Sequence, residues 1–337
     1  MNFFKQSLKN EGERKWIAVP SELADIDGRK KDINIEVMED GLPRAMAFFD
    51  IDGTLAHLSV IHGEAIRKLF PDVDPEELET VYYAGFKLGN SFREFDRMKE
   101  IYIDGHTEWK DPQIYFSERF LPHAQEIDEP GNSAHEVAAS ILKAYGETAT
   151  AVADELYQKD PQQFEASNIT PIFLLARLYS RLGIPMVGFT ANAKVLVERL
   201  AKYLRLSDIF LDIATDEDMA GGGKEIAVLH LIKKMENKSI PVPKDRLIFV
   251  GDSIRGDIGI LSKVKAADHK INGQGILVLK DKQALIQIKK EISSDLILRN
   301  IVDSIEVNGL VVGDVPLDEK GKPMLWSRFR RDFMERL

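Results

Sequence analysis

Residues 48–55 read FFDIDGTL and place two carboxylates, Asp50 and Asp52, directly after an apolar run. Ala45 to Phe49 has the composition of a short buried strand, and Gly53 can turn the chain sharply behind it. Side chains alternate along a strand, so Asp50 and Asp52 can face the same way at its carboxyl end. Parallel sheets collect their ligands at that end. The stretch therefore predicts a ligand site on an open α/β sheet.

Paired carboxylates of this kind suit phosphoryl transfer. An ionised Asp50 could attack phosphorus and form an aspartyl-phosphate. Asp52 could protonate the leaving oxygen and later take a proton from water. Oxygen ligands favour Mg²⁺ over zinc, and the seven His residues show no metal-binding spacing. The pair is a weak signal by itself, because Asp is common in loops, where its side chain hydrogen-bonds to nearby backbone.

A second apolar run, Ile184 to Phe189, ends in Thr190-Ala191-Asn192. Apolar residues then recur at helical spacing, at Val195, Leu196, Leu200 and Leu204. A hydroxyl and free backbone N–H groups at the start of a helix form an anion site. The alternative is that Thr190 only caps the helix that follows.

A candidate cation for the phosphoryl group is Lys224, which follows three consecutive glycines at 221–223. A flexible loop could bring its ammonium to the site, where the charge would stabilise the transition state. The segment is not a Walker A loop, because position 218 is Asp and Glu225 stands where Ser or Thr is required. Lys233 and Lys234 are rivals, although they lie inside an expected helix. The default for a lone Lys is a solvated surface charge.

A third apolar strand, Leu247 to Val250, is followed by Gly251-Asp252-Ser253 and then by Asp257. Asp252 is the natural third oxygen ligand, with Asp257 as its hydrogen-bonded neighbour or as a direct ligand. The alternative is that Asp252 and Ser253 cap the following helix.

Four motifs in this order, FFDIDGTL, GFTAN, GGGK and FVGDSIRGD, resemble those of the haloacid dehalogenase superfamily. The resemblance covers roughly half of the chain. It implies Asp50 as nucleophile, Asp52 as general acid and base, and a Mg²⁺ site formed by Asp50 and Asp252 with the Asp52 carbonyl. Asp257 is our additional candidate for that site. The phosphate-binding residues that we assign are Gly53, Thr190, Ala191, Asn192 and Lys224.

The carboxylate at Asp52 also distinguishes activities within that superfamily. Members that cleave carbon–halogen or carbon–phosphorus bonds lack it, so the chain resembles a phosphatase or a phosphomutase. The chain departs from the family pattern at Glu225, where relatives often have Pro, and at Thr170-Pro171, where Pro-Gly is frequent. These departures leave the subfamily open.

The expected architecture is α/β, a Rossmann-like open parallel sheet with an inserted α-helical cap domain. We expect an N-terminal extension at 1–40, a core at 41–58 and 166–300, a helical cap at 59–165 and a C-terminal extension at 301–337. The predicted cap helices are Ile61 to Phe70, Pro75 to Lys87, Phe92 to Tyr102 and Ala134 to Tyr157. The cap would close over the site and exclude water. Its candidate substrate-selecting residues are His57, His62, Lys87, Arg93 and Arg97.

Further core elements are predicted from shorter patterns. Ile209 to Ile213 and Ile276 to Leu279 are candidate strands, and Gln283 to Ile292 is a candidate helix. The N-terminal extension could wrap the core or serve a partner. At the other end, Trp326, Phe329, Phe333 and Leu337 share one helical face, which packs on the parent domain or forms a homodimer contact.

Composition narrows the functional classes. The chain has no Cys, so we expect a reducing cytoplasm and no thiolate catalysis. Its N-terminus shows no secretory signal, and no apolar run has membrane-spanning length. A formal charge of −10 disfavours nucleic acid as a partner. We therefore expect a cytoplasmic magnesium-dependent phosphatase of a small phosphorylated metabolite, with a phosphomutase or a non-catalytic phospholigand-binding protein as alternatives.

Overall fold

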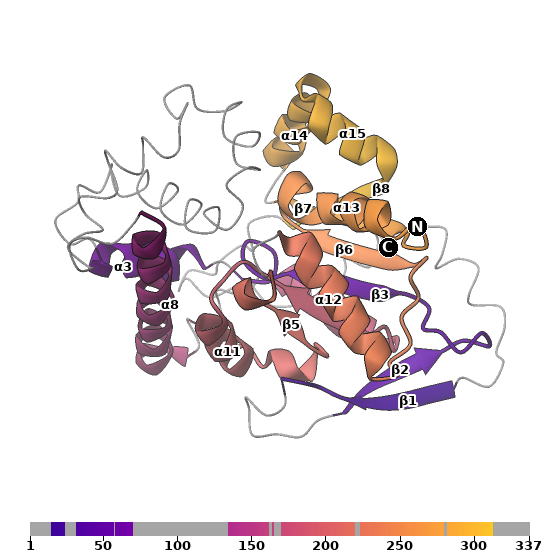
Figure 1. Ribbon diagram of the computed structural model, residues 1–337, viewed down its shortest axis with the longest axis horizontal. Coiled ribbons are helices and arrows are strands. Elements are labelled where there is room, and N and C mark those ends of the chain that lie inside the picture. The colour runs from indigo at the N-terminus through magenta and orange to yellow at the C-terminus, as the bar shows by residue number, and fades with distance from the viewer. Residues whose placement is uncertain are drawn as a thin grey trace, which may run out of the picture.

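The computed structural model describes residues 15–23, 32–56, 58–69, 134–161, 164, 170–219, 223–279 and 282–312. Within these residues, a six-stranded sheet has the strand order β5-β4-β3-β6-β7-β8 (Figure 1). Every pairing in it is parallel. The strands are β3 (Met46–Asp50), β4 (Met186–Phe189), β5 (Ile213–Ala214), β6 (Leu247–Gly251), β7 (Gly273–Leu279) and β8 (Glu306–Val311). The predicted α/β class is confirmed.

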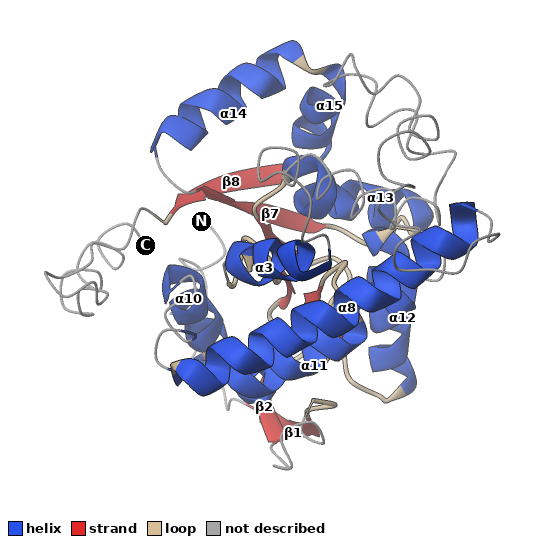
Figure 2. Cartoon of the chain, turned by 90° about the vertical axis from the view of Figure 1, so that its left-hand side faces the viewer, coloured by secondary structure: helices blue, strands red, loops and turns tan. Residues whose placement is uncertain are grey.

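Helices cover both faces of this sheet (Figure 2). Side chains from α3, α8, α10 and α11 share one hydrophobic cluster, and side chains from α12, α13, α14 and α15 share the other. These helices are α3 (Ser59–Leu69), α8 (Ala134–Lys159), α10 (Thr170–Arg181), α11 (Lys194–Tyr203), α12 (Lys224–Asn237), α13 (Gly259–Ala267), α14 (Lys282–Ser294) and α15 (Leu296–Ser304). Short helical turns lie at η3 (Leu206–Asp208), η4 (Asp216–Met219) and η5 (Ile254–Ile258).

The central strands are apolar throughout because both of their faces are buried. In β3, Ala47 and Phe49 belong to one cluster, and Met46 and Phe48 belong to the other. Phe48 stacks on Phe249 of β6 with ring centroids 4.8 Å apart. Such continuous runs are what the sequence showed at β3, β4 and β6.

The chain reverses its direction of winding beside β3. From β3 it moves outward to β4 and β5, and it then returns through α12 to β6 on the other side of β3. In open parallel sheets, ligands bind where the winding reverses, beyond the carboxyl ends of the strands. The topology therefore predicts a ligand site beyond the carboxyl ends of β3 and β6.

Part of the predicted N-terminal extension packs on the core. β1 (Lys15–Pro20) and β2 (Asp32–Val37) form an antiparallel pair. The backbone N–H of Glu36 donates to the Gly183 carbonyl at 3.0 Å, and Ile35 is fully buried in a core cluster. The described part of this segment therefore wraps the core, which was one of its two predicted roles.

The core sheet also extends beyond the expected boundary at residue 300. β8 pairs in parallel with β7 from Gln274↔Glu306 to Leu279↔Val311. It is an edge strand whose exposed side chains gave no continuous apolar run, so 301–311 had been assigned to the C-terminal extension. The helix predicted around Trp326 lies outside the described residues, and its homodimer role stays a prediction.

Two of the predicted cap helices correspond to α3 and α8. The predicted helices at 75–87 and 92–102 lie outside the described residues, as do His57, Lys87, Arg93 and Arg97. Helix α3 contacts α8, and α8 in turn contacts α11 of the core. In Figure 2 the long helix α8 runs beside α11.

One strand prediction was wrong. Ile209 to Ile213 is mostly turn, and only Ile213–Ala214 joins the sheet as β5. Phe210 and Leu211 are fully buried, so this apolar run packs on the sheet without extending it. The helix predicted at 283–292 and the strand at 276–279 are confirmed as parts of α14 and β7.

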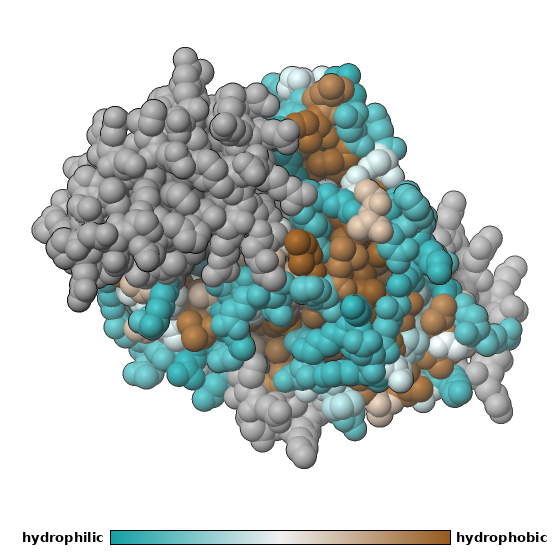
Figure 3. Space-filling view, viewed as in Figure 1, coloured by the Kyte–Doolittle hydropathy of each residue, from teal (hydrophilic) through white to brown (hydrophobic). Residues whose placement is uncertain are grey.

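Two further observations concern the surface. Among the described residues, no helix combines the length and apolar character needed to cross a membrane. Exposed large apolar side chains lie on α14 and α15, at Ile286, Leu296 and Ile297, and Figure 3 shows apolar surface over these helices.

Candidate active site

Strand register brings the predicted site residues together. Asp50 ends β3 and pairs with Phe189, so Thr190 follows directly at the end of β4. On the other side, Phe49 pairs with Val250, which places Asp252 just beyond the end of β6. Three segments far apart in sequence thus deliver polar side chains to one edge of the sheet.

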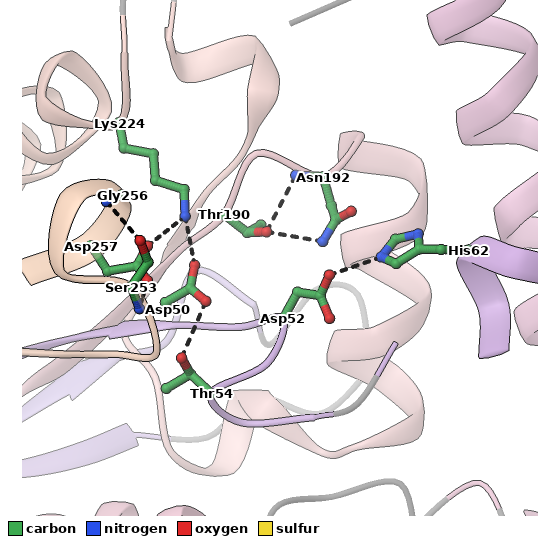
Figure 4. A network of polar contacts seen from close by, with 10 residues as sticks. All are labelled: Asp50, Asp52, Thr54, His62, Thr190, Asn192, Lys224, Ser253, Gly256 and Asp257. Atoms are coloured by element: carbon green, nitrogen blue, oxygen red, sulfur yellow. Dashed lines mark hydrogen bonds and ion pairs between the residues drawn. The ribbon is translucent and has the colours of Figure 1, made fainter. Parts of the chain in front are cut away.

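An acidic cluster surrounds the Lys224 ammonium (Figure 4). Lys224 Nζ lies 2.8 Å from Asp50 Oδ1 and 2.7 Å from Asp257 Oδ1. Ligand oxygens of Asp50, Asp252 and Asp257 all lie within 4.8 Å of one another. Asp50 also accepts a hydrogen bond from the Thr54 hydroxyl at 3.2 Å. The rival Lys234 instead pairs with Asp212 and Glu22, and Lys233 is exposed.

The charges in this cluster perturb one another. Burial, followed by the negative charge of Asp257, raises the pKa of Asp50 well above its usual 3.8. Partial burial, followed by the negative charge of Asp257, raises the pKa of Asp252 to about 7, although part of the Asp252 side chain remains exposed. Burial opposes the charge of Lys224, but Asp257 and Asp50 outweigh it and raise its pKa. The cluster therefore favours an additional cation.

Asp52 lies in a different environment. Its Oδ2 lies 3.0 Å from His62 Nε2, and its Oδ1 accepts the Leu58 backbone N–H at 3.2 Å. Burial acts to raise the pKa of Asp52, but the interactions with His62, the Leu58 N–H and the charge of Lys224 together outweigh it, so the pKa is lowered. Figure 4 shows the Asp52 side chain extending toward His62, which belongs to α3.

Only glycine fits at position 53, for two independent reasons. Its φ of +74° lies in the left-handed region, which favours glycine. A Cβ at this position would lie 2.3 Å from Asp252 Oδ2. The turn after β3 therefore passes directly against a predicted metal ligand, and any side chain there would displace Asp252.

Thr190 does not cap α11, whose N-cap residue is Ala193. Its hydroxyl oxygen accepts hydrogen bonds from the backbone N–H and the side-chain Nδ2 of Asn192, at 3.2 and 3.0 Å. Thr190 and Asn192 are both buried, and Asn192 Oδ1 has no hydrogen-bond partner among the residues that the structure describes. Ala191 is half-buried between them. The hydroxyl hydrogen of Thr190 thus stays available for an anion.

The alternative reading of the β6 segment holds for Ser253 but not for Asp252. The Ser253 hydroxyl accepts the Gly256 N–H at 2.9 Å and caps η5. Asp257 Oδ2 accepts the Ser253 N–H at 2.9 Å, so the buried Asp257 holds this loop as well as Lys224. Asp252 is left facing the cluster.

The sequence did not indicate every residue of this site. Thr54 lies in the FFDIDGTL motif, and its position four residues after Asp50 suits a turn contact. The sequence predicts a substrate-selecting role for His62 and gives no signal for Tyr145. His62 Nδ1 contacts the Tyr145 hydroxyl across 83 sequence positions, and no local pattern signals such a contact.

The acidic cluster fits Mg²⁺. This ion binds carboxylate oxygens at about 2.1 Å in an octahedron, so opposite ligands lie about 4.2 Å apart. The spread of the three carboxylates, within 4.8 Å, is close to that span. Their charges also exceed what one ammonium can balance.

Comparison with known proteins agrees with this fold. Residues 45–264 match the family of haloacid dehalogenase-like hydrolases, and the chain belongs to that family. It is therefore a hydrolase by family. No curated protein sequence matches it.

Solved structures with similar folds share little sequence with the chain. YfnB from Bacillus subtilis, bound to magnesium, has 15% identity and a TM-score of 0.42, and covers 69% of this chain and 88% of its own. CbbY from Rhodobacter sphaeroides, in complex with phosphate, has 19% identity and a TM-score of 0.40, with coverage of 69% and 85%. A β-phosphoglucomutase from Clostridium difficile has 17% identity and a TM-score of 0.40, with coverage of 75% and 98%.

Proposed function

We propose that this protein is a magnesium-dependent phosphatase that hydrolyses a small phosphomonoester through an aspartyl-phosphate on Asp50. The observation that carries the proposal is the placement of Lys224 between Asp50 and Asp257, with Asp252 beside them at the carboxyl edge of the sheet. An ammonium and a buried carboxylate at this edge can bind a phosphoryl group and attack it.

In the first half of the reaction, an Asp50 oxygen attacks phosphorus and forms the aspartyl-phosphate bond. The bond from phosphorus to the ester oxygen breaks, and Asp52 gives its proton to that oxygen. Lys224 balances the charge on the phosphoryl oxygens. The Thr190 hydroxyl and the Ala191 backbone N–H orient the same oxygens.

In the second half, Asp52 takes a proton from a water molecule whose oxygen attacks phosphorus. The bond to Asp50 breaks, inorganic phosphate leaves, and both carboxyl groups return to their starting states. Mg²⁺, held by Asp50, Asp252, Asp257 and the Asp52 carbonyl, would neutralise the negative charge that keeps a carboxylate and a phosphate apart.

Asp50→Asn tests this proposal most directly. We expect no phosphate release from a panel of phosphomonoesters in the presence of Mg²⁺, whereas the wild type releases phosphate only when Mg²⁺ is present. Asp268→Asn is the matched control, because that carboxylate pairs with Lys244 beyond the C-terminal end of α13. Equal turnover by wild type and Asp50→Asn, with both proteins folded, would rule out Asp50 as the nucleophile.

The phosphomutase alternative shares the first half-reaction but returns the phosphoryl group to the substrate. It requires the cap to hold a bisphosphate while it reorients. Measuring phosphate release and isomerisation of sugar phosphates in one assay separates the two activities. A protein without turnover that still binds phosphoesters would favour the non-catalytic alternative.

The proposed substrate is a small phosphorylated metabolite, and the proposed location is the cytoplasm. A cap inserted at 59–165 would restrict the size of the substrate. Local positive charge from Lys224 and Mg²⁺ suffices for such a ligand, even though the chain is acidic overall.

A further inference from the structure

Two helices of the predicted cap converge on Asp52 through a pair of buried side chains. His62 of α3 and Tyr145 of α8 are 1% and 6% exposed. Their rings stack with centroids 5.9 Å apart, and the Tyr145 hydroxyl contacts His62 Nδ1. The other ring nitrogen, Nε2, lies 3.0 Å from Asp52 Oδ2. Asp52 is thus linked through His62 to Tyr145.

The position of Tyr145 is set by how α8 packs on the core. Its neighbour Gly146 packs against Ala193, immediately before α11, and a Cβ at 146 would lie 2.7 Å from the Ala193 Cβ. Farther along, Tyr157 stacks on Tyr203 of α11 at 3.9 Å, and the Tyr203 hydroxyl donates to Asp154. Helix α8 is therefore held against α11 at both ends of this contact.

The hydrogen-bonding roles along this chain of contacts follow from the chemistry of imidazole. A neutral ring has one donor nitrogen and one acceptor nitrogen. If the Tyr145 hydroxyl donates to Nδ1, the proton of His62 must be on Nε2, where it donates to Asp52. Leu58 N–H holds the other Asp52 oxygen at 3.2 Å. Both oxygens of the carboxylate are then oriented.

We propose that Tyr145 is a positioning residue for Asp52, which acts by fixing His62 as an Nε2–H donor to Asp52 Oδ2. The inference rests on the proposed phosphatase function, because Asp52 is the proton-transfer group of that reaction and Tyr145 of α8 would hold it in place. The link from Tyr145 to Asp52 is indirect, because it runs through the His62 ring. Its effect reaches the reaction only through the orientation of His62 and Asp52.

The first test needs no turnover. Nitrogen NMR of the imidazole rings, with His62 assigned from the signals that His62→Gln removes, reports which nitrogen carries the proton. We expect Nε2 protonated and Nδ1 hydrogen-bonded in the wild type. Tyr145→Phe should move the Nδ1 signal toward that of a free imidazole, whereas Tyr203→Phe should leave it unchanged. A ring protonated at Nδ1 in the wild type, or no change in Tyr145→Phe, would overturn the inference.

The second test uses two esters that differ in their need for a proton donor. Glycerol 2-phosphate has an alkoxide leaving group, which requires protonation, and p-nitrophenyl phosphate does not. Tyr145→Phe should lower kcat for glycerol 2-phosphate about 10-fold, with KM and the p-nitrophenyl rate within about 2-fold of wild type. Tyr203→Phe removes a hydroxyl contact to the same helix and should leave the ratio of the two rates unchanged.

Substitutions of His62 separate positioning from packing. His62→Gln keeps a donor near the Nε2 position and should retain more activity on glycerol 2-phosphate than His62→Ala. Equal losses on both esters in Tyr145→Phe would show a merely structural role and refute the inference. A wild type that hydrolyses neither ester would refute the proposed function instead, and the NMR result would still decide whether Tyr145 fixes His62.

Discussion

The two carboxylates of the FFDIDGTL motif are two residues apart, yet they belong to two different halves of the site. Asp50 lies in the acidic half, with Asp252, Asp257 and Lys224, all carried by segments at the end of the core sheet. Asp52 lies in the helical half, against His62 of α3. In the acidic half the pKa values of Asp50 and Asp252 are raised, and at Asp52 the pKa is lowered.

This difference shows how the surrounding fold gives two chemically identical carboxylates, Asp50 and Asp52, different roles. The acidic half places negative charges together, so it requires a cation and can bind a metal and a phosphate. The helical half gives Asp52 a hydrogen-bond donor and an orientation of its own. A nucleophile must be ionised, so the raised pKa of Asp50 means that a cation bound at the acidic cluster is needed before Asp50 can attack.

We expect the largest loss of activity, and the strongest test of the division into an acidic and a helical half, from Lys224→Met. Loss of the ammonium removes the positive side chain that contacts Asp50 and Asp257, so we expect kcat to fall about 10²–10³-fold on both alkyl and aryl phosphates. Steady-state phosphate release measures this. Lys234→Met is the control on the same helix, since Lys234 pairs with Asp212 outside the site. A loss confined to alkyl phosphates would contradict the division, because that pattern belongs to the helical half.

A smaller effect is expected from Gly53→Ala, which acts where the two halves meet. A side chain at φ +74° costs about 1–2 kcal/mol, and its Cβ would also displace Asp252. We expect thermal unfolding at lower temperature and weaker Mg²⁺ binding by calorimetry. Gly41→Ala separates the two causes, because Gly41 has φ +76° with nothing within 4 Å of the added Cβ. Unchanged Mg²⁺ affinity in Gly53→Ala would show that Asp252 is not a metal ligand.

The smallest effect is expected in the pH dependence of stability without metal. The pKa of Asp252 rises from 3.8 to about 7 on folding, so the folded protein binds more protons than the unfolded chain between these values. Its contribution to stability is therefore lost as the pH rises through this interval. Asp52 acts with the opposite sign, because its lowered pKa contributes stability that is lost as the pH falls.

The raised pKa of Asp50 acts in the same direction as that of Asp252. Thermal unfolding with a chelator, scanned over this pH interval, measures the balance of these three carboxyl groups. Asp252→Asn should flatten the decline in stability toward higher pH, and Asp52→Asn should not. Mg²⁺ should oppose the decline, because it stabilises the ionised carboxylates of the folded state. A decline that is the same in wild type and Asp252→Asn would show that another group causes it.

Much of the core could be predicted from local patterns. Strands β3, β4 and β6 are buried on both faces, so each is a continuous apolar run, and each is followed by the polar residue that it delivers. The same criterion failed at Ile209 to Ile213, where buried side chains pack against the sheet in a turn. It also missed β8, because an edge strand with exposed side chains has no such run. Apolar runs report burial, and burial alone does not distinguish a strand from a turn.

By itself, the sequence determined the central strands β3, β4 and β6, the order of its motifs and the carboxylates at the sheet edge, because strand periodicity and motif spacing are local properties of the chain. Only the tertiary structure decided that Lys224 lies between Asp50 and Asp257, and that His62 and Tyr145 support Asp52. Lys224 lies 174 positions from Asp50, and Tyr145 lies 83 positions from His62. Contacts at such separations depend on strand register and helix packing, which no short pattern encodes.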